Sequence, residues 1–250
     1  SDTLTLDGGV TFQDAKVDAA YIVTPNSLHR EHTERAVRAG VHVLCEKPMA
    51  PSVADCMAMD RAAKDAGVKL MLAYRLHFEQ GNLTAIERAQ DGSLGKVKLF
   101  SSVFTQQVRA NDIRTRSELG GGSVLDLGVY PINAARYLFR SEPIEVLAIS
   151  PPSLDPRAAG VEETVTAILR FPRGEIAQFT VSQGAASVSS YRLVGTEGDL
   201  RVEPAYDYVE DIRHHLTRDG RTEVTTFKRR DQFAAEFSAE YAQLLRDAYP

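Results

Sequence analysis

Hydrophobic residues follow a strand-then-helix pattern in the first part of the chain. Residues 17–24 (VDAAYIVT) form a continuous apolar run rich in β-formers, which predicts a strand buried on both faces of a parallel sheet. Residues 28–39 then carry apolar side chains at helical spacing; Asn26 or Ser27 can cap the start of this helix, and Gly40 can end it.

The same pattern repeats immediately. Residues 41–46 (VHVLCE) predict a second strand, and a second helix begins at Ser52, which has capping-box spacing with Asp55. Residues 68–74 (VKLMLAY) predict a third strand. Short crossovers of this kind make strands parallel with right-handed connections, so residues 1–74 are predicted to be half of a doubly wound, Rossmann-type α/β domain.

A complete dinucleotide-binding domain needs two such halves, with a Gly-rich phosphate turn after its first strand. The sequence contains no G-x-G-x-x-G and begins with Ser1 rather than Met. Residues 1–16 are too few to contain the other half. We therefore expect the first half to lie upstream; the alternative is that the protein does not bind a dinucleotide in that manner.

Residues 75–250 have a different pattern, which predicts an α+β domain with a large open, mostly antiparallel sheet. Turn residues 172–174 and 218–220 separate successive strand-like runs. The longer predicted elements are a helix near residues 82–90, a strand at 96–108, a helix at 123–139 and a closing helix at 231–249.

Composition excludes several classes of protein. Lys and Arg total 29 against 34 Asp and Glu, a formal charge of -5, which disfavours binding to nucleic acid or an anionic membrane. No apolar run approaches the roughly 20 residues of a membrane span and no signal peptide is apparent, so we expect a cytoplasmic protein. The spacing of Cys45 and Cys56 indicates free thiols.

The remaining catalytic signatures are weak. His29 and His32 lie three residues apart on one predicted helix, where a solvated face explains them, and no histidine pair is accompanied by an acidic third ligand. We therefore expect no metal site. No serine stands in a G-x-S-x-G elbow, which disfavours hydrolases of that type.

Two segments follow predicted strands, at the edge where open α/β sheets bind ligands. They are Thr24–His29 (TPNSLH) and Cys45–Pro48 (CEKP). A lysine held there, Lys47, can place its charge against a nicotinamide ribose or donate a hydrogen bond to a substrate hydroxyl. The alternative is a solvated ion pair of Glu46 with Lys47 before a turn proline.

A third segment, Gly120–Phe139, begins with three glycines, which allow close backbone approach to a ligand or another chain. Ser123 and Asp126 have capping-box spacing at the start of the predicted helix. Asp126 and Tyr130 lie four residues apart on one stripe, where a carboxylate and a phenol can bind a sugar hydroxyl and pass its proton during hydride transfer. Alternatively, Asp126 only caps the helix and Tyr130 only packs.

The order and spacing of these three segments resemble the glucose-fructose oxidoreductase, inositol dehydrogenase and MocA-like family. The motifs are PNSLH, AGVHVLCEKPMA and GGGSVLDLGVYPINAARYLF, and YRLHFE at Tyr74–Glu79 strengthens the match. Tyr130 stands where many members carry a histidine, which resembles the glucose-fructose oxidoreductase branch. The resemblance extends from Val17 to about Phe237.

The resemblance implies hydride exchange between a nicotinamide cofactor and a carbinol or carbonyl carbon of a sugar or polyol. The branch implies NADP, with NAD as the alternative. Lys47 and Tyr130 would hydrogen-bond the reacting hydroxyl, one of them accepting its proton, and Asp126 would be the acidic residue of the same catalytic set. The residues implied at the cofactor are Thr24, Pro25, Asn26, His29, Glu46, Lys47, Tyr74 and Arg75.

Two other functions stay open at this point. One is a glycosidase of the same fold that uses tightly held NAD for transient oxidation, and the other is a non-catalytic sensor or scaffold. We also expect a homodimer or higher homo-oligomer, because an open sheet needs a cover for its exposed face. The apolar residues of strands Ala167–Phe171 and Ala177–Val181 are the expected interface.

Overall fold

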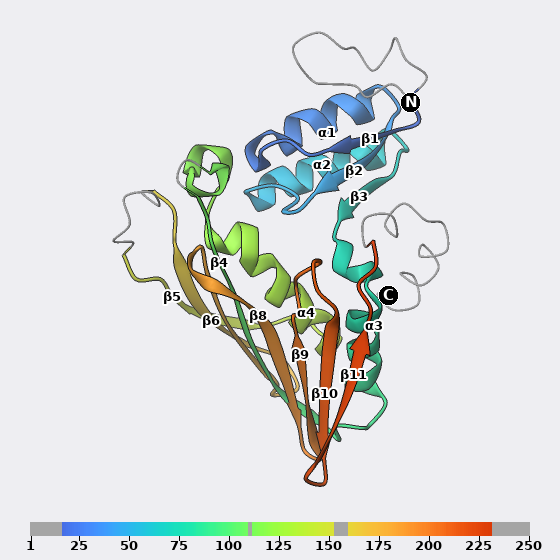
Figure 1. Cartoon of the computed structure of the whole chain (residues 1–250). Helices are drawn as coiled ribbons and strands as arrows, with labels where there is room; N and C mark the ends of the chain where they lie inside the picture. Colours follow the sequence, from blue (N-terminus) through green and yellow to red (C-terminus); the bar gives the residue numbers. More distant parts are fainter. Residues whose placement is uncertain (1–16, 110–111, 153–159, 232–250) are drawn as a thin grey trace. The chain divides into compact units, whose positions relative to one another are not determined.

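The structure, a computed structural model, describes residues 17–109, 112–152 and 160–231 (Figure 1). Contacts between Cα atoms divide the chain into two units. The first ends at Tyr74 and also includes Glu118–Gly120, and the second comprises Arg75–Ser117 and the chain from Gly121 onward.

The first unit is a three-stranded parallel sheet with two helices. Its strands lie in the order β1-β2-β3, and both strand pairs are parallel, as the β-α-β-α-β pattern predicted. Its elements are β1 (Ala19–Ile22), a short 3-10 turn η1 (Asn26–Leu28), α1 (His29–Arg38), β2 (His42–Glu46), α2 (Val53–Asp65) and β3 (Leu70–Ala73).

The core of this unit lies on one face of the sheet. Ile22 and Cys45, which pair in neighbouring strands, are buried together with Met59 of α2. The prediction that residues 17–24 are buried on both faces is wrong, because the side chains of Tyr21 and Val23 are 41% and 63% exposed. The two described helices contribute to the core on the Ile22 face and leave the alternate positions of β1 uncovered.

The two helix starts differ from each other. The predicted capping box of α2 is confirmed, since the Asp55 backbone N–H donates to Ser52 Oγ at 3.1 Å. The predicted cap of α1 is wrong: α1 has no side-chain capping bond, and η1 leads into it. The Asn26 amide instead donates to the Gly120 carbonyl at 2.8 Å, so a distant segment uses the group that local spacing assigned to the helix.

The second unit is built on an eight-stranded sheet in the order β11-β10-β9-β8-β4-β7-β6-β5. Every neighbouring pair is antiparallel except β4 and β7, which are parallel, so the mostly antiparallel sheet was predicted correctly. The strands are β4 (Val97–Gln107), β5 (Glu145–Ile149), β6 (Thr164–Arg170), β7 (Ile176–Ser182), β8 (Gly184–Gly195), β9 (Gly198–Glu203), β10 (Ile212–Arg218) and β11 (Arg221–Phe227).

Two helices, α3 (Gln80–Gln90) and α4 (Val129–Phe139), lie on one side of this sheet (Figure 1). Most of the apolar residues that we expected at a subunit interface belong to the core, whereas Ile168 of β6 is 38% exposed. Leu169, Phe171, Phe179 and Val181 are at most 5% exposed, because alternate residues of β6 and β7 point to the covered face.

The predicted turns and ends have mixed outcomes. The turn at residues 218–220 is confirmed: Asp219 and Gly220 both have positive φ and join β10 to β11 as a two-residue hairpin. The helix predicted at residues 231–249 lies outside the described residues, apart from its first position. Within the described ranges, no helix is long and apolar enough to cross a membrane.

Candidate active site

In the first unit, the candidate residues lie where β1 and β2 end. Lys47 directly follows β2, is half-buried and joins Pro48 through a cis peptide bond. The Glu46 carboxylate accepts hydrogen bonds from the Lys47 backbone N–H, at 3.1 Å, and from the Tyr21 hydroxyl. The side chain of Glu46 is therefore engaged with the main chain beside Lys47.

His29 joins the two loops at these strand ends. Its ring is fully buried, with Nδ1 2.9 Å from the Pro48 carbonyl oxygen and Nε2 2.9 Å from the Thr24 carbonyl oxygen. The predicted solvated face is therefore wrong for His29. The first residue of α1 lies between the two strand-end loops, where two carbonyl groups bond the ring.

The three glycines at residues 120–122 do provide close backbone approach, but within this chain. A Cβ atom on Gly120, whose φ is +77°, would lie 2.8 Å from the Asn26 Cβ. A Cβ atom on Gly121 would lie 2.4 Å from the Arg114 carbonyl oxygen. The glycines therefore allow the loop to pack against other segments of the same protein.

In the second unit, Asp126 lies in a single π-helical turn, η5 (Val124–Gly128), which leads directly into α4. The predicted capping box with Ser123 is wrong: the N-terminus of η5 has no side-chain capping bond, and the Ser123 hydroxyl donates to the Glu163 carbonyl. π-Turns occur frequently at functional sites, and this one replaces the regular α-helical stripe expected there.

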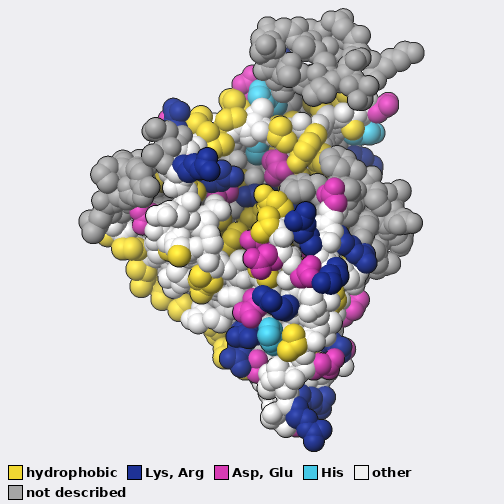
Figure 2. All heavy atoms as spheres, in the orientation of Figure 1, with side chains coloured by type: hydrophobic (Ala, Val, Ile, Leu, Met, Phe, Trp, Pro, Cys, Tyr) yellow, Lys and Arg dark blue, Asp and Glu magenta, His cyan; other side chains and the backbone are white. Residues whose placement is uncertain are grey.

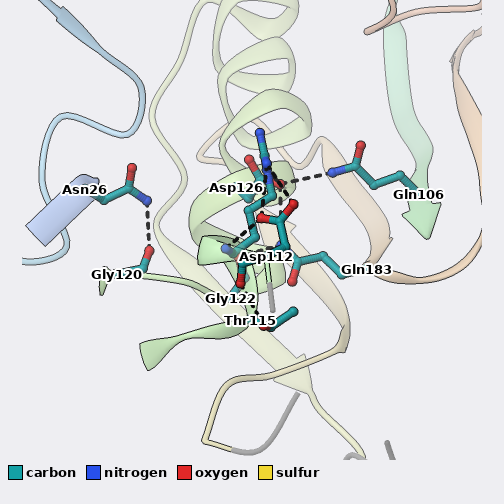
Figure 3. A network of polar contacts seen from close by, with 9 residues as sticks. Asn26, Gln106, Asp112, Thr115, Gly120, Gly122, Asp126 and Gln183 are labelled. Carbon is teal, nitrogen blue, oxygen red and sulfur yellow. Dashed lines mark hydrogen bonds and ion pairs between the residues drawn. The ribbon is translucent and has the colours of Figure 1, made fainter. Parts of the chain in front are cut away.

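Three side chains converge on the Oδ2 atom of Asp126 (Figure 3). Gln106 donates at 3.1 Å and Gln183 at 3.4 Å, and Arg114 Nε lies 3.0 Å away. Asp126 is only 7% exposed, so these donors replace the water that a carboxylate needs. Burial opposes the charge of Arg114, but the carboxylates of Asp126 and Asp112 outweigh it and raise the arginine pKa.

Tyr130 lies one turn further along, on α4, and is 7% exposed. The ring of Phe104 meets it edge-on at 5.4 Å between centroids. The guanidinium carbon of Arg75 lies 5.6 Å from the Tyr130 ring centroid and 4.9 Å from that of Tyr208. Arg75 also donates to the Tyr206 carbonyl. These contacts fix the Tyr130 ring beside a buried cation.

Two further residues of α4, Asn133 and Tyr137, contact His77. Its Nε2 lies 3.3 Å from Asn133 Oδ1, and its ring meets Tyr137 edge-on at 4.9 Å between centroids. Burial lowers the pKa of His77 to about 4, although the Asn133 hydrogen bond acts in the opposite direction. His77 is therefore neutral at physiological pH and donates or accepts as an uncharged ring.

The predicted site residues thus fall into two groups. The first unit brings together the strand-end loops, and the second unit brings together Arg75 and Tyr130. Tyr74 is 4% exposed and is the last residue of the first unit. Within the described residues, no cluster of three or more His, Cys, Asp or Glu side chains could hold a metal ion.

Sequence reasoning missed the residues that hold Asp126 and Tyr130. They are Gln106, Arg114, Gln183, Tyr206 and Tyr208. They come from loops and strands up to 131 residues from their partners, and none belongs to a motif. The only signal available was the unusual polarity of Gln106 and Gln183 at or just beyond the ends of β-rich runs.

Comparison with known proteins identifies the family. A model of the NAD-binding Rossmann fold of an oxidoreductase family matches residues 10–74, and a model of the GFO/IDH/MocA C-terminal domain matches residues 82–201. The D-xylose 1-dehydrogenase [NADP(+)] of Haloarcula marismortui is 31% identical over 263 residues, covering 100% of this chain and 73% of the relative. A dTDP-3,4-didehydro-2,6-dideoxy-alpha-D-glucose 3-reductase of Streptomyces violaceoruber is 36% identical, covering 93% and 68%.

Solved structures agree. The aldose-aldose oxidoreductase of Caulobacter crescentus, in complex with glycerol, matches with a TM-score of 0.85 and 38% identity over 92% of this chain and 70% of that one. A 3-ketoreductase of Actinomadura kijaniata, in complex with NADP and TDP-benzene, matches with a TM-score of 0.83 and 27% identity over 98% and 76%. The chain belongs to the GFO/IDH/MocA family of NAD(P)-dependent oxidoreductases.

The residues at the ends of β1 and β2 fit part of a nicotinamide dinucleotide. Ligands of open α/β sheets bind beyond the carboxyl ends of the strands, and this edge carries the Thr24 hydroxyl, the Asn26 amide and the Lys47 ammonium. Hydroxyl, amide and ammonium groups suit a ribose and a carboxamide. No Gly-rich phosphate turn occurs among the residues of this sequence, so the fit concerns the nicotinamide end of the cofactor.

Proposed function

We propose that this protein exchanges a hydride between NADP and a carbinol or carbonyl carbon of a sugar or polyol. Lys47, Asp126 and Tyr130 are its catalytic residues in this proposal. Its main support is the setting of Tyr130, a phenol fixed by Arg75 and Phe104 one turn after a buried carboxylate that Arg114 holds. Relatives named for NADP and for xylose or deoxysugars support the choice of cofactor and substrate.

Each residue has a distinct task in the proposed reaction. The nicotinamide, when bound, supplies or accepts the hydride. Lys47 and Tyr130 hydrogen-bond the reacting hydroxyl, and one of them, as the neutral amine or the phenolate, accepts its proton as the carbonyl forms. Arg114 and two glutamines hold the Asp126 carboxylate, which orients the substrate as a hydrogen-bond acceptor.

The residues proposed to bind the cofactor form two groups. Thr24, Pro25, Asn26, Glu46 and Lys47 would hold its nicotinamide end from the strand-end loops of the first unit. His29, also expected at the cofactor, is fully buried between these loops and would act through them. Tyr74 and Arg75 follow β3, at the corresponding end of the third strand. Their role in the proposal is to shape the floor of the binding site rather than to contact the reacting atoms.

The first test is the cofactor content and the turnover of the purified protein. Denaturation releases bound nucleotide, and enzymatic cycling distinguishes NADP from NAD. Aldoses and polyols are then supplied with each cofactor while nicotinamide absorbance is followed. Turnover with net cofactor reduction is expected. Release of free sugar without net reduction would indicate a glycosidase, and no binding of either cofactor would leave a sensor or scaffold.

Substitutions assign the residues. Lys47→Met and Tyr130→Phe are expected to lower kcat by at least about a hundredfold, the scale of a positioned acid or base. Matched controls are Lys64→Met, which removes an exposed lysine paired with Asp60, and Tyr137→Phe on the same helix as Tyr130. Both controls should retain most of the activity. Unchanged kcat in Lys47→Met would remove Lys47 from the mechanism.

We also propose that the second unit associates with a second copy of itself through the uncovered face of its sheet. Leu99 and Ile168 on that face are 47% and 38% exposed. At the sheet edge, Val146, Leu147 and Ile149 of β5 are 64–68% exposed, and Figure 2 shows hydrophobic side chains gathered over β5 and β6. Light scattering should give a dimer or larger; a monomer at micromolar concentration would contradict the proposal.

The expected compartment is the cytoplasm. Cys45 and Cys56 are both free, and Cys45 is buried, so its pKa is raised to about 12, chiefly by desolvation. Free thiols persist in reducing compartments. Fractionation of cells that express the protein tests this expectation.

A further inference from the structure

The ring of His29 has an arrangement of partners that a neutral histidine cannot satisfy. Its Nδ1 and Nε2 atoms each lie 2.9 Å from an oxygen, and both oxygens belong to backbone carbonyls, of Pro48 and Thr24. A carbonyl oxygen only accepts hydrogen bonds. The ring is 0% exposed, so water does not compete for either nitrogen from bulk solvent.

A neutral imidazole has one N–H group and one nitrogen lone pair. Whichever tautomer it adopts, one nitrogen lone pair would face a carbonyl lone pair at hydrogen-bond distance. Only the imidazolium donates from both nitrogens. We infer that His29 is a buried imidazolium that ties together the loops after β1 and β2, and that it thereby positions the backbone beside Lys47.

His29 is the first residue of α1, where the helix dipole disfavours a cation, and His32 on the same helix bonds the Thr24 hydroxyl at 3.1 Å. β2 ends at Glu46, Lys47 follows it, and the Glu46 carboxylate accepts from the Lys47 backbone N–H at 3.1 Å. Two charge-assisted hydrogen bonds to carbonyls are the interactions that offset the dipole and the burial.

The consequence for function follows from where the two carbonyls lie, and it rests on the proposed function. Pro48 is the residue after Lys47, and Thr24 opens the loop that carries Pro25 and Asn26. His29 therefore fixes the main chain of both loops proposed to meet the nicotinamide end. It is a positioning residue: with no exposed surface, it does not itself touch the cofactor.

Nitrogen NMR of the purified protein tests the protonation state directly. Histidine labelled with ¹⁵N in the ring is incorporated, spectra are recorded at pH 7.5, and the His29 signals are assigned by their loss in His29→Asn. Both ring nitrogens of His29 are expected at protonated shifts, with two N–H protons that exchange slowly with solvent. One nitrogen at the unprotonated shift would overturn the inference. This measurement needs no enzymatic activity.

Kinetics test the positioning role. His29→Asn keeps a donor for at most one carbonyl, and His29→Phe keeps none. We expect KM for NADP to rise at least tenfold and kcat to fall in His29→Phe, with His29→Asn between it and the unchanged protein. The control is His42→Asn, an exposed histidine at the start of β2, which should change neither constant.

The two readouts separate the possible failures. If His29→Phe does not fold, the NMR result on the unchanged protein still decides the protonation state. If His29→Phe folds and keeps the original kcat and KM, the positioning role is overturned. If the unchanged protein neither binds nor turns over a nicotinamide cofactor, the proposed function fails, while a doubly protonated His29 would still establish the imidazolium.

Discussion

The two units hold their buried polar groups in different ways. In the first unit, His29 meets the backbone carbonyls of Thr24 and Pro48, so side chain and main chain are tied together. In the second unit, the Asp126 carboxylate is held by an arginine and two glutamines, so side chains hold one another. Substitution of His29 should therefore change the path of the loops that it bonds. Substitution of Asp126 should instead leave the charge of Arg114 less well compensated.

Among the substitutions that test this difference between the units, Asp126→Asn is expected to lower the free energy of unfolding most. The amide keeps the shape of the carboxylate but leaves Arg114 with Asp112 as its remaining carboxylate partner. We expect the free energy of unfolding to fall by roughly 2–3 kcal/mol, the scale of a hydrogen bond to a charged group, at the lower end because Arg114 is 44% exposed. Urea unfolding followed by circular dichroism measures the change.

The matched control is Glu142→Gln, which breaks an ion pair with Arg136 at 2.6 Å. Both of its partners are substantially exposed, so the loss should stay below about 1 kcal/mol. Equal losses in the two variants would mean that burial does not distinguish Asp126, and the charge-balance description of the second unit would be wrong.

Acid should weaken the second unit through its buried histidines. Burial lowers the pKa of both His77 and His214 to about 4. Their ordinary value is near 6.5, so between about pH 6.5 and pH 4 the unfolded chain binds more protons than the folded one. The free energy of unfolding therefore falls as pH falls through this window, by on the order of 2 kcal/mol per histidine between pH 7 and pH 5.

Urea unfolding of His77→Phe at pH 7 and pH 5 isolates one of these contributions. The variant cannot titrate at that position, so its loss of stability between the two pH values should be smaller than that of the unchanged protein. His42→Phe, at an exposed position of the first unit, should show the full loss. An identical pH dependence in His77→Phe would rule out the buried ring as its source.

The contrast between the units also explains what the sequence could predict. The parallel pairing of the strands of the first unit and the capping of α2 depend on residues close together in the chain, and both were predicted. The partners of Asp126 are not local: Gln183 lies 57 residues away, and nothing in periodicity or motif spacing brings it there. The π-helical turn at Val124–Gly128 was not predicted either, because the pattern of its sequence is that of an ordinary α-helix.

Predictions from local spacing were also wrong where a polar side chain bonds a backbone carbonyl of another segment instead of its own helix. Asn26 and Ser123 had the spacing of helix caps, but their side chains donate to the carbonyls of Gly120 and Glu163. A solvated helix face was expected for His29, but its ring lies between two loops. In each case a backbone carbonyl from elsewhere in the chain decided where the polar side chain points.

The smallest expected change in the free energy of unfolding concerns the helix cap of α2, which depends on residues close together in the chain. Ser52→Ala removes the hydroxyl that accepts from the Asp55 N–H at 3.1 Å and donates to the Asp55 carboxylate at 2.6 Å. Loss of such a cap should lower the free energy of unfolding by about 1 kcal/mol. Ser27→Ala, at an exposed position of a turn without a side-chain capping bond, should have no measurable effect. A similar loss in both variants would show that the capping bond is not what stabilises α2.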